Sequence, residues 1–166
     1  MKSKFITLKL GVKKNKTDGL LICLSESSTT ELIFTLNKFA AAPVIISKQN
    51  ITKSNPKYIF INSGNANACT GKEGLTNTKR ILNLLAKRLK CNSNEIIIMS
   101  TGIIGRQLPI DDIEASIIKN TFNKYSSLKD AACSVMTTDN HPKYLSKDYK
   151  IGSKKITFSG LCKGAG

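Results

Sequence analysis

The sequence is poor in the residues that build metal sites and disulfide frameworks. It has no tryptophan and a single histidine, His141, and its five cysteines form no C-x-x-C pair. Zinc sites usually draw on cysteines and histidines at short, regular spacings, so a zinc site is not expected. An odd set of unpaired cysteines is typical of free thiols in a reducing compartment.

Long apolar runs are also missing. No stretch approaches the roughly 20 apolar residues that span a bilayer, and residues 1–12 lack the unbroken apolar segment of a secretory signal peptide. The sequence therefore predicts a cytoplasmic protein without a membrane partner. The 166 residues, 40% of them hydrophobic, suit a single unit over residues 1–166. Because aromatic residues make up only 6% of the chain, its core should consist mainly of Ile, Leu and Val.

Acidic residues are few, and so are arginines. There are 11 Asp and Glu against 26 Lys and Arg, which gives a formal net charge of +15. Base and phosphate recognition favours the bidentate contacts of arginine, which is present only as Arg80, Arg88 and Arg106. The lysines are scattered, with no run of five like charges. We therefore expect no nucleic-acid partner, and an acidic partner surface or an anionic substrate is the second interpretation of the charge.

The first part of the chain predicts a layer of short strands. Its first apolar run alternates with polar residues, which is typical of a half-buried strand. A polar stretch with an Asp-Gly pair follows and suits a hairpin turn before a second, buried strand. Two further apolar runs complete an N-terminal β layer that extends to Ile46. The four runs are residues 5–10, 20–24, 32–36 and 44–47.

Between residues 58 and 122 the pattern changes to strand, helix, strand, helix, so the predicted fold class is mixed α/β. The predicted elements are a strand at 58–61, a loop at 62–74, a helix at 76–90, a strand at 95–100 and a helix that begins near Pro109. A short helix at 130–136 and a hairpin within 149–158 should follow. Residues 160–166 should form a small, flexible end.

Three segments of small and polar residues follow apolar elements, where α/β proteins usually place their sites. In the segment at residues 100–105, the consecutive N–H groups of Thr101-Gly102 could bind an anion or a developing oxyanion, although a simple strand-to-helix turn explains the pair as well. Residues 62–69 could let backbone or substrate approach closely, or could be a polar surface loop. In the third segment, Thr137 and the later Lys163 could hold the polar end of an amino acid, or could serve as a helix-end cap and a solvated lysine. No nucleophile–base pair is apparent.

These segments together carry a family resemblance. Residues 60–71 contain the string Asn-Ser-Gly-Asn-Ala-Asn-Ala, and residues 100–105 are followed by Leu108-Pro109. Residues 136–139 and 163–166 come next in the same order. In sequence, order and approximate spacing the set resembles the bifunctional glutamate N-acetyltransferases, also called ornithine acetyltransferases, over almost the whole chain.

The resemblance implies an ornithine acetyltransferase-like fold and an acyltransferase of arginine biosynthesis. Members of that family cleave themselves before a threonine, which becomes the N-terminal nucleophile of the β chain. It takes acetyl from N-acetylornithine and passes it to glutamate. This chain would be the α portion of an α2β2 heterotetramer, truncated before the self-cleavage threonine and inactive alone. No cofactor is expected, and acetyl-CoA is an additional acetyl donor in some members.

The same resemblance assigns roles to four residues. Thr101 and Gly102 match the oxyanion-hole pair, and Thr137 and Lys163 match substrate-binding residues. The sequence departs from the family pattern at Cys162, where members often carry a small residue, and at the two residues before Pro142. Two other interpretations stay open: a non-catalytic basic binding module that retains the fold, and a related self-processing hydrolase.

Overall fold

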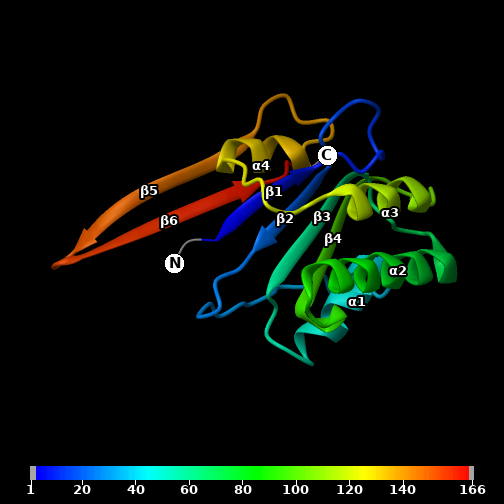
Figure 1. The fold of residues 1–166 in the computed structure, drawn as a ribbon, viewed down its shortest axis with the longest axis horizontal. Coiled ribbons are helices and arrows are strands. Elements are labelled where there is room, and N and C mark those ends of the chain that lie inside the picture. The colour runs from blue at the N-terminus through cyan, green and yellow to red at the C-terminus, as the bar shows by residue number, and fades with distance from the viewer. Residues whose placement is uncertain (1–2, 165–166) are drawn as a thin grey trace.

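The computed structural model describes residues 3–164, in which a four-stranded sheet has helices on both faces and a long two-stranded hairpin projects from one end (Figure 1). The elements are β1 (Lys4–Leu8), β2 (Gly19–Cys23), α1 (Ala42–Ile51), β3 (Tyr58–Asn65), α2 (Gly71–Leu89), the 3-10 turn η1 (Ser93–Glu95), β4 (Ile96–Ile103), α3 (Ile110–Lys119), α4 (Leu128–Val135), β5 (Lys143–Ile151) and β6 (Lys154–Cys162).

The strand order in the main sheet is β1-β2-β3-β4. β1 and β2 form the predicted antiparallel hairpin, β3 is antiparallel to β2, and β4 is parallel to β3. The parallel pair is joined through α2, so the carboxyl ends of β3 and β4 lie at the same end of the sheet. The predicted order of strand, helix, strand, helix between residues 58 and 122 is confirmed, although β3 extends to Asn65 and α2 begins at Gly71, both inside the predicted loop.

The predicted N-terminal β layer is only partly confirmed. Residues 32–36 have no regular structure, and residues 44–47 lie in helix α1 and not in a strand. Pro43 stands in the first turn of this helix, where its fixed φ angle and missing N–H are tolerated. That signal outweighs the short β-branched run after it, because a run of three apolar residues fits a buried helix as well as a strand.

Two hydrophobic clusters of unequal size pack on the two faces of the sheet. On one face, Ile and Leu side chains pack with Phe60 against α1, α2 and α3. On the other face a smaller cluster of Leu20, Ala131 and Val135 packs under α4. This second helix layer lies over β1, β2 and part of β3, and Met99 of β4 remains 49% exposed on that face. The expected core of Ile, Leu and Val is confirmed for Ile and Leu, but Val135 is the one valine among the buried residues within 3–164.

The C-terminal hairpin is longer than the sequence indicated. β5 and β6 pair in a continuous antiparallel register from Lys143↔Cys162 to Ile151↔Lys154. Period-2 alternation is diluted here by lysines and serines, which is why only its tip was predicted. Since β6 includes residues 160–162, the expected flexible end is wrong for that part, and residues 165–166 lie outside the described residues.

All five cysteine thiols are free, as expected. Within residues 3–164, no helix combines the length and the apolar character needed to cross a bilayer.

Candidate active site

Several segments meet where the parallel strands β3 and β4 end. Figure 1 shows the β1–β2 loop, the last turn of α4 and the end of β6 gathered there. Binding sites of α/β proteins usually lie at the carboxyl ends of parallel strands. The residues predicted from sequence, Thr101, Gly102, Thr137 and Lys163, all lie in or next to these segments.

The outer edge of β4 is bonded to side chains of α1 over its first half. Ser47 Oγ donates to the carbonyl of Ile98 at 2.7 Å and accepts the N–H of the same residue at 2.9 Å. Asn50 Nδ2 donates to the carbonyl of Ile96 at 2.9 Å. Both side chains are buried, so these bonds satisfy the outer edge of β4, which pairs with no further strand in the described part of the chain.

The N–H of Gly102 belongs to this same outer edge. Backbone groups of a strand alternate between its two edges, and Gly102 lies an even number of residues after Ile98. Thr101 has the opposite parity, so its N–H faces β3, where Thr101 pairs with Ser63 and Asn65. By this parity the two consecutive N–H groups point to opposite edges of β4, so we do not expect both in one cleft. The pair can instead offer the Gly102 amide together with the Thr101 hydroxyl.

The side chain of Thr101 lies on the α4 face of the sheet. In the neighbouring strand, Ser63 is its register partner and donates a hydrogen bond to the carbonyl of Ser134 at 2.5 Å. Ser134 lies at the end of α4, and this helix does not extend over β4. Thr101 is therefore half-buried beside the covered part of the face, next to the exposed Met99.

β3 and β4 approach each other closely at two glycines. A Cβ on Gly102, whose φ is +131°, would lie 2.3 Å from the carbonyl carbon of Gly64. A Cβ on Gly64, whose φ is +106°, would lie 2.7 Å from Cγ of Lys13. Glycine alone tolerates both the backbone angle and the contact. The close backbone approach predicted for residues 62–69 is confirmed.

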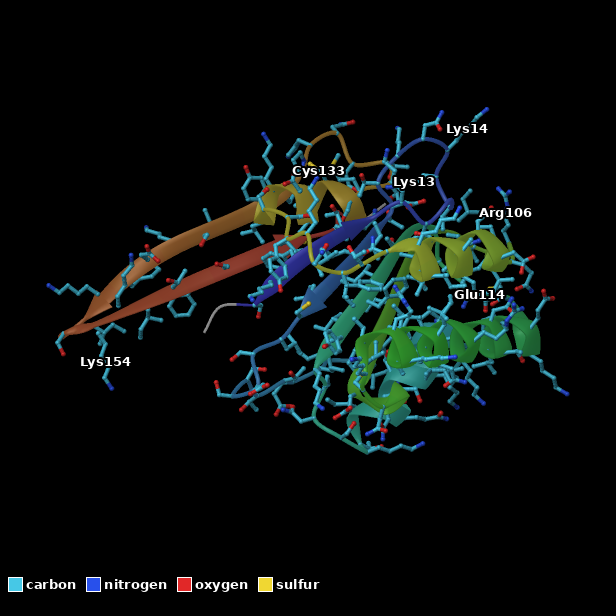
Figure 2. All side chains as sticks on the ribbon, viewed as in Figure 1. Lys13, Lys14, Arg106, Glu114, Cys133 and Lys154 are labelled. Carbon is cyan, nitrogen blue, oxygen red and sulfur yellow. The ribbon has the colours of Figure 1, made fainter. Side chains whose placement is uncertain are left out.

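Lys13 links this strand pair to the segment that contains Thr137. Its stem lies over Gly64, and its ammonium donates to the carbonyl of Met136 at 2.9 Å and to that of Ser134 at 3.4 Å. Figure 2 shows Lys13 beside the α4 end of the molecule. Burial lowers the pKa of Lys13, although nearby Asp18 opposes the shift. The ammonium thus holds the carbonyls that end α4 in place.

Asp139 gathers the predicted substrate residues. Its carboxylate accepts the N–H of Thr137 at 3.1 Å and that of Gly164 at 2.8 Å. The ammonium groups of Lys143 and Lys163 approach it to 3.0 and 3.3 Å. The hydrogen bond from Lys143, with those from Thr137, Gly164 and Lys163, holds the pKa of Asp139 well below its usual range. Thr137 and Lys163, distant in sequence, are therefore joined through one carboxylate.

This carboxylate should make the stability of the site depend on acid pH. Because the folded-state pKa of Asp139 is lowered, its contribution is complete above the unfolded value of about 4 and is lost as the pH falls toward the folded value. We expect Asp139→Asn to lower Tm at pH 7, with the difference from the parent protein closing below about pH 4. Thermal denaturation between pH 7 and pH 3 measures this. In the matched control Asp111→Asn, a carboxylate 95% exposed, Tm should change less. A difference that widened in acid would contradict the assignment.

A hollow of about 640 Å³ adjoins the Asp139 cluster and is lined by Thr137 and Asp139. Three lysines in its lining suit an anionic group such as a carboxylate. They are Lys13, Lys16 and Lys124. Of the four predicted residues only Thr137 lines this hollow. Thr101 and Gly102 are connected to it through their neighbours Ser63 and Gly64, and Lys163 is connected to it through Asp139.

The segment at residues 62–69 is not a surface loop. Asn62, Asn65 and Asn67 are buried, and their side chains bond to the protein itself. Asn65 Nδ2 donates to the carbonyls of Arg106 and Gln107, which follow β4, at 2.9 and 3.1 Å. Asn67 Nδ2 donates to the hydroxyl of Thr78 in α2 at 2.8 Å. These amides fix the turns around the end of the parallel pair, so their direct role is in shaping the site.

A family model for the ArgJ family matches residues 4–166. The chain belongs to the ArgJ family. It is 42% identical over 162 residues to the arginine biosynthesis bifunctional protein ArgJ 2 of Clostridium acetobutylicum, covering 95% of this chain and 40% of that protein. It spans about two fifths of the length of the curated relatives it matches.

Two solved structures of this family share the fold. The arginine biosynthesis bifunctional protein ArgJ of Bacillus halodurans aligns with a TM-score of 0.87 and 28% identity, over 99% of this chain and 87% of that chain. The ornithine acetyltransferase of Mycobacterium tuberculosis, complexed with ornithine, aligns with a TM-score of 0.84 and 29% identity, over 99% of this chain and 89% of that chain. The family and the mixed α/β fold predicted from sequence are thus confirmed.

Two residues of this neighbourhood were not assigned a place in the site from sequence. Lys13 lies in the Gly-Val-Lys-Lys segment at residues 11–14, which carries no chemical signature. Asp139 ends the Met-Thr-Thr-Asp segment, which the sequence singled out without giving this aspartate a role of its own. The contact of Lys13 with Met136 and that of Asp139 with Gly164 join residues more than 20 positions apart, which no local pattern indicates.

Proposed function

We propose that this chain is the α portion of an acetyltransferase that moves acetyl from N-acetylornithine to glutamate. In this proposal Thr101 and Gly102 stabilise the oxyanion, and Thr137 and Lys163 contact the substrate. The observation that carries it is the convergence of these residues, through Ser63 and Asp139, on the carboxyl end of one parallel strand pair. Membership of the ArgJ family supports the same chemistry.

The proposed reaction needs a donor set of this kind. A nucleophilic oxygen attacks the acetyl carbonyl of N-acetylornithine, and negative charge develops on the carbonyl oxygen. An amide and a hydroxyl aimed at that oxygen stabilise the tetrahedral intermediate. Its collapse breaks the C–N bond, the amine leaves as ornithine with a proton, and the acetyl group stays on the enzyme as an ester. The amino group of glutamate then attacks the ester and releases the nucleophile.

In this proposal the nucleophile is the N-terminal threonine of a β chain produced by self-cleavage. The uncovered face of β4 beside Thr101 supports an approach from another polypeptide. The lengths of the relatives support two chains: this sequence spans 40% of a curated relative but 87% and 89% of chains in solved structures. The acetyl group is carried on the enzyme itself, so the reaction requires no cofactor, and acetyl-CoA would serve only as another donor.

The experiment is a reconstitution. The chain alone, and the chain produced together with the remaining β portion of its protein, are assayed for transfer of acetyl from N-acetylornithine to glutamate. We expect transfer only with both portions, because the α portion lacks the attacking hydroxyl. Transfer by the purified α portion alone would refute the assignment of the nucleophile to the β portion. Release of acetate with no acetylated glutamate would indicate a hydrolase, and no reaction in an assembled pair would refute the proposed activity.

A further inference from the structure

The hairpin formed by β5 and β6 has two chemically different faces. On one face the side chains bond to one another across the strands. Ser146 and Ser159 hydroxyls are 2.8 Å apart, and Thr157 Oγ1 donates to Asp148 at 2.6 Å. Lys155 forms an ion pair of 2.8 Å with the same carboxylate. This face is satisfied by its own polar contacts and is suited to water.

The opposite face is apolar and exposed. The strand register places Tyr149 opposite Ile156 and Lys147 opposite Phe158. Tyr149 and Phe158 meet edge to face, with ring centroids 5.5 Å apart. Yet Phe158 is 61% exposed, and Leu145 is 68% exposed. The apolar side chains of this face are Leu145, Tyr149, Ile151, Ile156 and Phe158.

Within residues 3–164, the body of the chain does not cover that apolar face. The hairpin contacts α4 near its base, where Leu161 packs against the cluster under α4. In the strand register Leu161 lies on the same face as the polar side chains. The apolar face is therefore turned away from the core of the chain. Figure 2 shows Lys154 at the far tip of the hairpin, well away from the helices. A two-stranded hairpin is at best marginally stable in water unless a third strand or a packed layer supports it.

We propose that the apolar face of the β5–β6 hairpin is the docking surface for the β portion of this protein, the polypeptide that corresponds to the rest of the curated relatives' length. This inference rests on the proposed function, in which that portion brings the nucleophile to the site. Both ends of the hairpin are tied to the site through Asp139, which binds Lys143 at the start of β5 and the N–H of Gly164 just after β6. A partner that reaches the site therefore also meets the hairpin.

Charge on the hairpin indicates the chemistry of the matching surface. Lys143, Lys147 and Lys154 lie on the apolar face, at its two ends and its middle. The whole chain carries a formal net charge of +15. Because Lys143 is already paired with Asp139, the β portion should present an apolar patch for the Tyr149–Phe158 pair, with acidic side chains placed to meet Lys147 and Lys154.

Two adjacent substitutions test this surface in the protein produced with both portions. Phe158→Asp places a charge on the apolar face, and Ser159→Asp places the same charge one residue further on, on the polar face. Both side chains are exposed in this chain, so neither change should unfold the body of the α portion, which circular dichroism checks. We expect Phe158→Asp to raise the Kd between the portions by about 100-fold or more, measured by sedimentation. Ser159→Asp should change it by no more than about threefold.

Hydrogen exchange provides a second measurement on the parent protein. Backbone amides of β5 and β6 should exchange rapidly in the α portion alone and become protected when the β portion is added. Equal effects of the two substitutions, or unchanged protection, would overturn the proposal. Self-association of the α portion that Phe158→Asp abolishes would assign the face to a second copy instead. Because assembly is measured without any assay of acetyl transfer, an assembled but inactive pair would refute the function and leave the interface intact.

Discussion

From the proposed oxyanion role of Thr101, its replacement by valine in the complete enzyme is expected to lower kcat by about 10²–10³-fold, as loss of one oxyanion donor typically does. Valine keeps the shape of threonine and removes only the hydroxyl. Because the N–H of Thr101 faces β3, the hydroxyl is the group of this residue that remains for the developing charge. KM should change little, since a donor aimed at the oxyanion acts mainly in the transition state.

The controls for this result follow from the position of Thr101. Its side chain is half-buried at the margin of the α4-covered face, so Thr101→Ala should lower kcat as Thr101→Val does, without a large loss of stability. Thr101→Ser, which retains the hydroxyl, should retain most of kcat. Steady-state kinetics of the variants with N-acetylornithine and glutamate make the comparison. Should Thr101→Val turn over at the parent rate, Thr101 would have no part in the chemistry.

Much of the fold could be predicted because its elements have a strong local signal. The stripe of apolar residues in α2 and the buried runs of β3 and β4 each identify one element without knowledge of the others. Helix α1 could not be identified in this way because its apolar residues share a short run with polar ones. Its Ser47 and Asn50 face the core only because they bond to the outer edge of β4. These contacts join segments far apart in the sequence, so no local stretch of the sequence indicates them.

The candidate site, too, could be predicted only in part from the sequence. Thr101, Gly102, Thr137 and Lys163 were predicted from segments whose order resembles a family, not from any chemical pattern of their own. The direction of each donor could not be predicted, because it depends on the parity of β4 relative to its two edges. The role of Asp139 as the common acceptor also needed the structure, since Lys143 begins the β5–β6 hairpin and Gly164 follows its end.

Replacing Gly102 by alanine should both destabilise the protein and abolish most activity. An added Cβ would lie 2.3 Å from the carbonyl carbon and 2.6 Å from the carbonyl oxygen of Gly64, and these are backbone atoms that cannot rotate away. The φ of +131° lies outside the left-handed region that alanine can enter at modest cost. Strain and overpacking together should cost about 3 kcal/mol of unfolding free energy.

Gly105→Ala is the matched control, because it separates a positive φ angle from a steric clash. Gly105 also has a positive φ, of +79°, but a Cβ there would meet nothing within 4 Å. Its replacement should cost only about 1 kcal/mol and leave kcat near the parent value. Urea denaturation of both variants gives the two free energies. If Gly102→Ala were no more destabilising than Gly105→Ala, the strands would not approach as closely as described. The Gly102 amide would then lack the fixed position that an oxyanion donor needs, because a donor contributes to a transition state only when the surrounding backbone holds it in place.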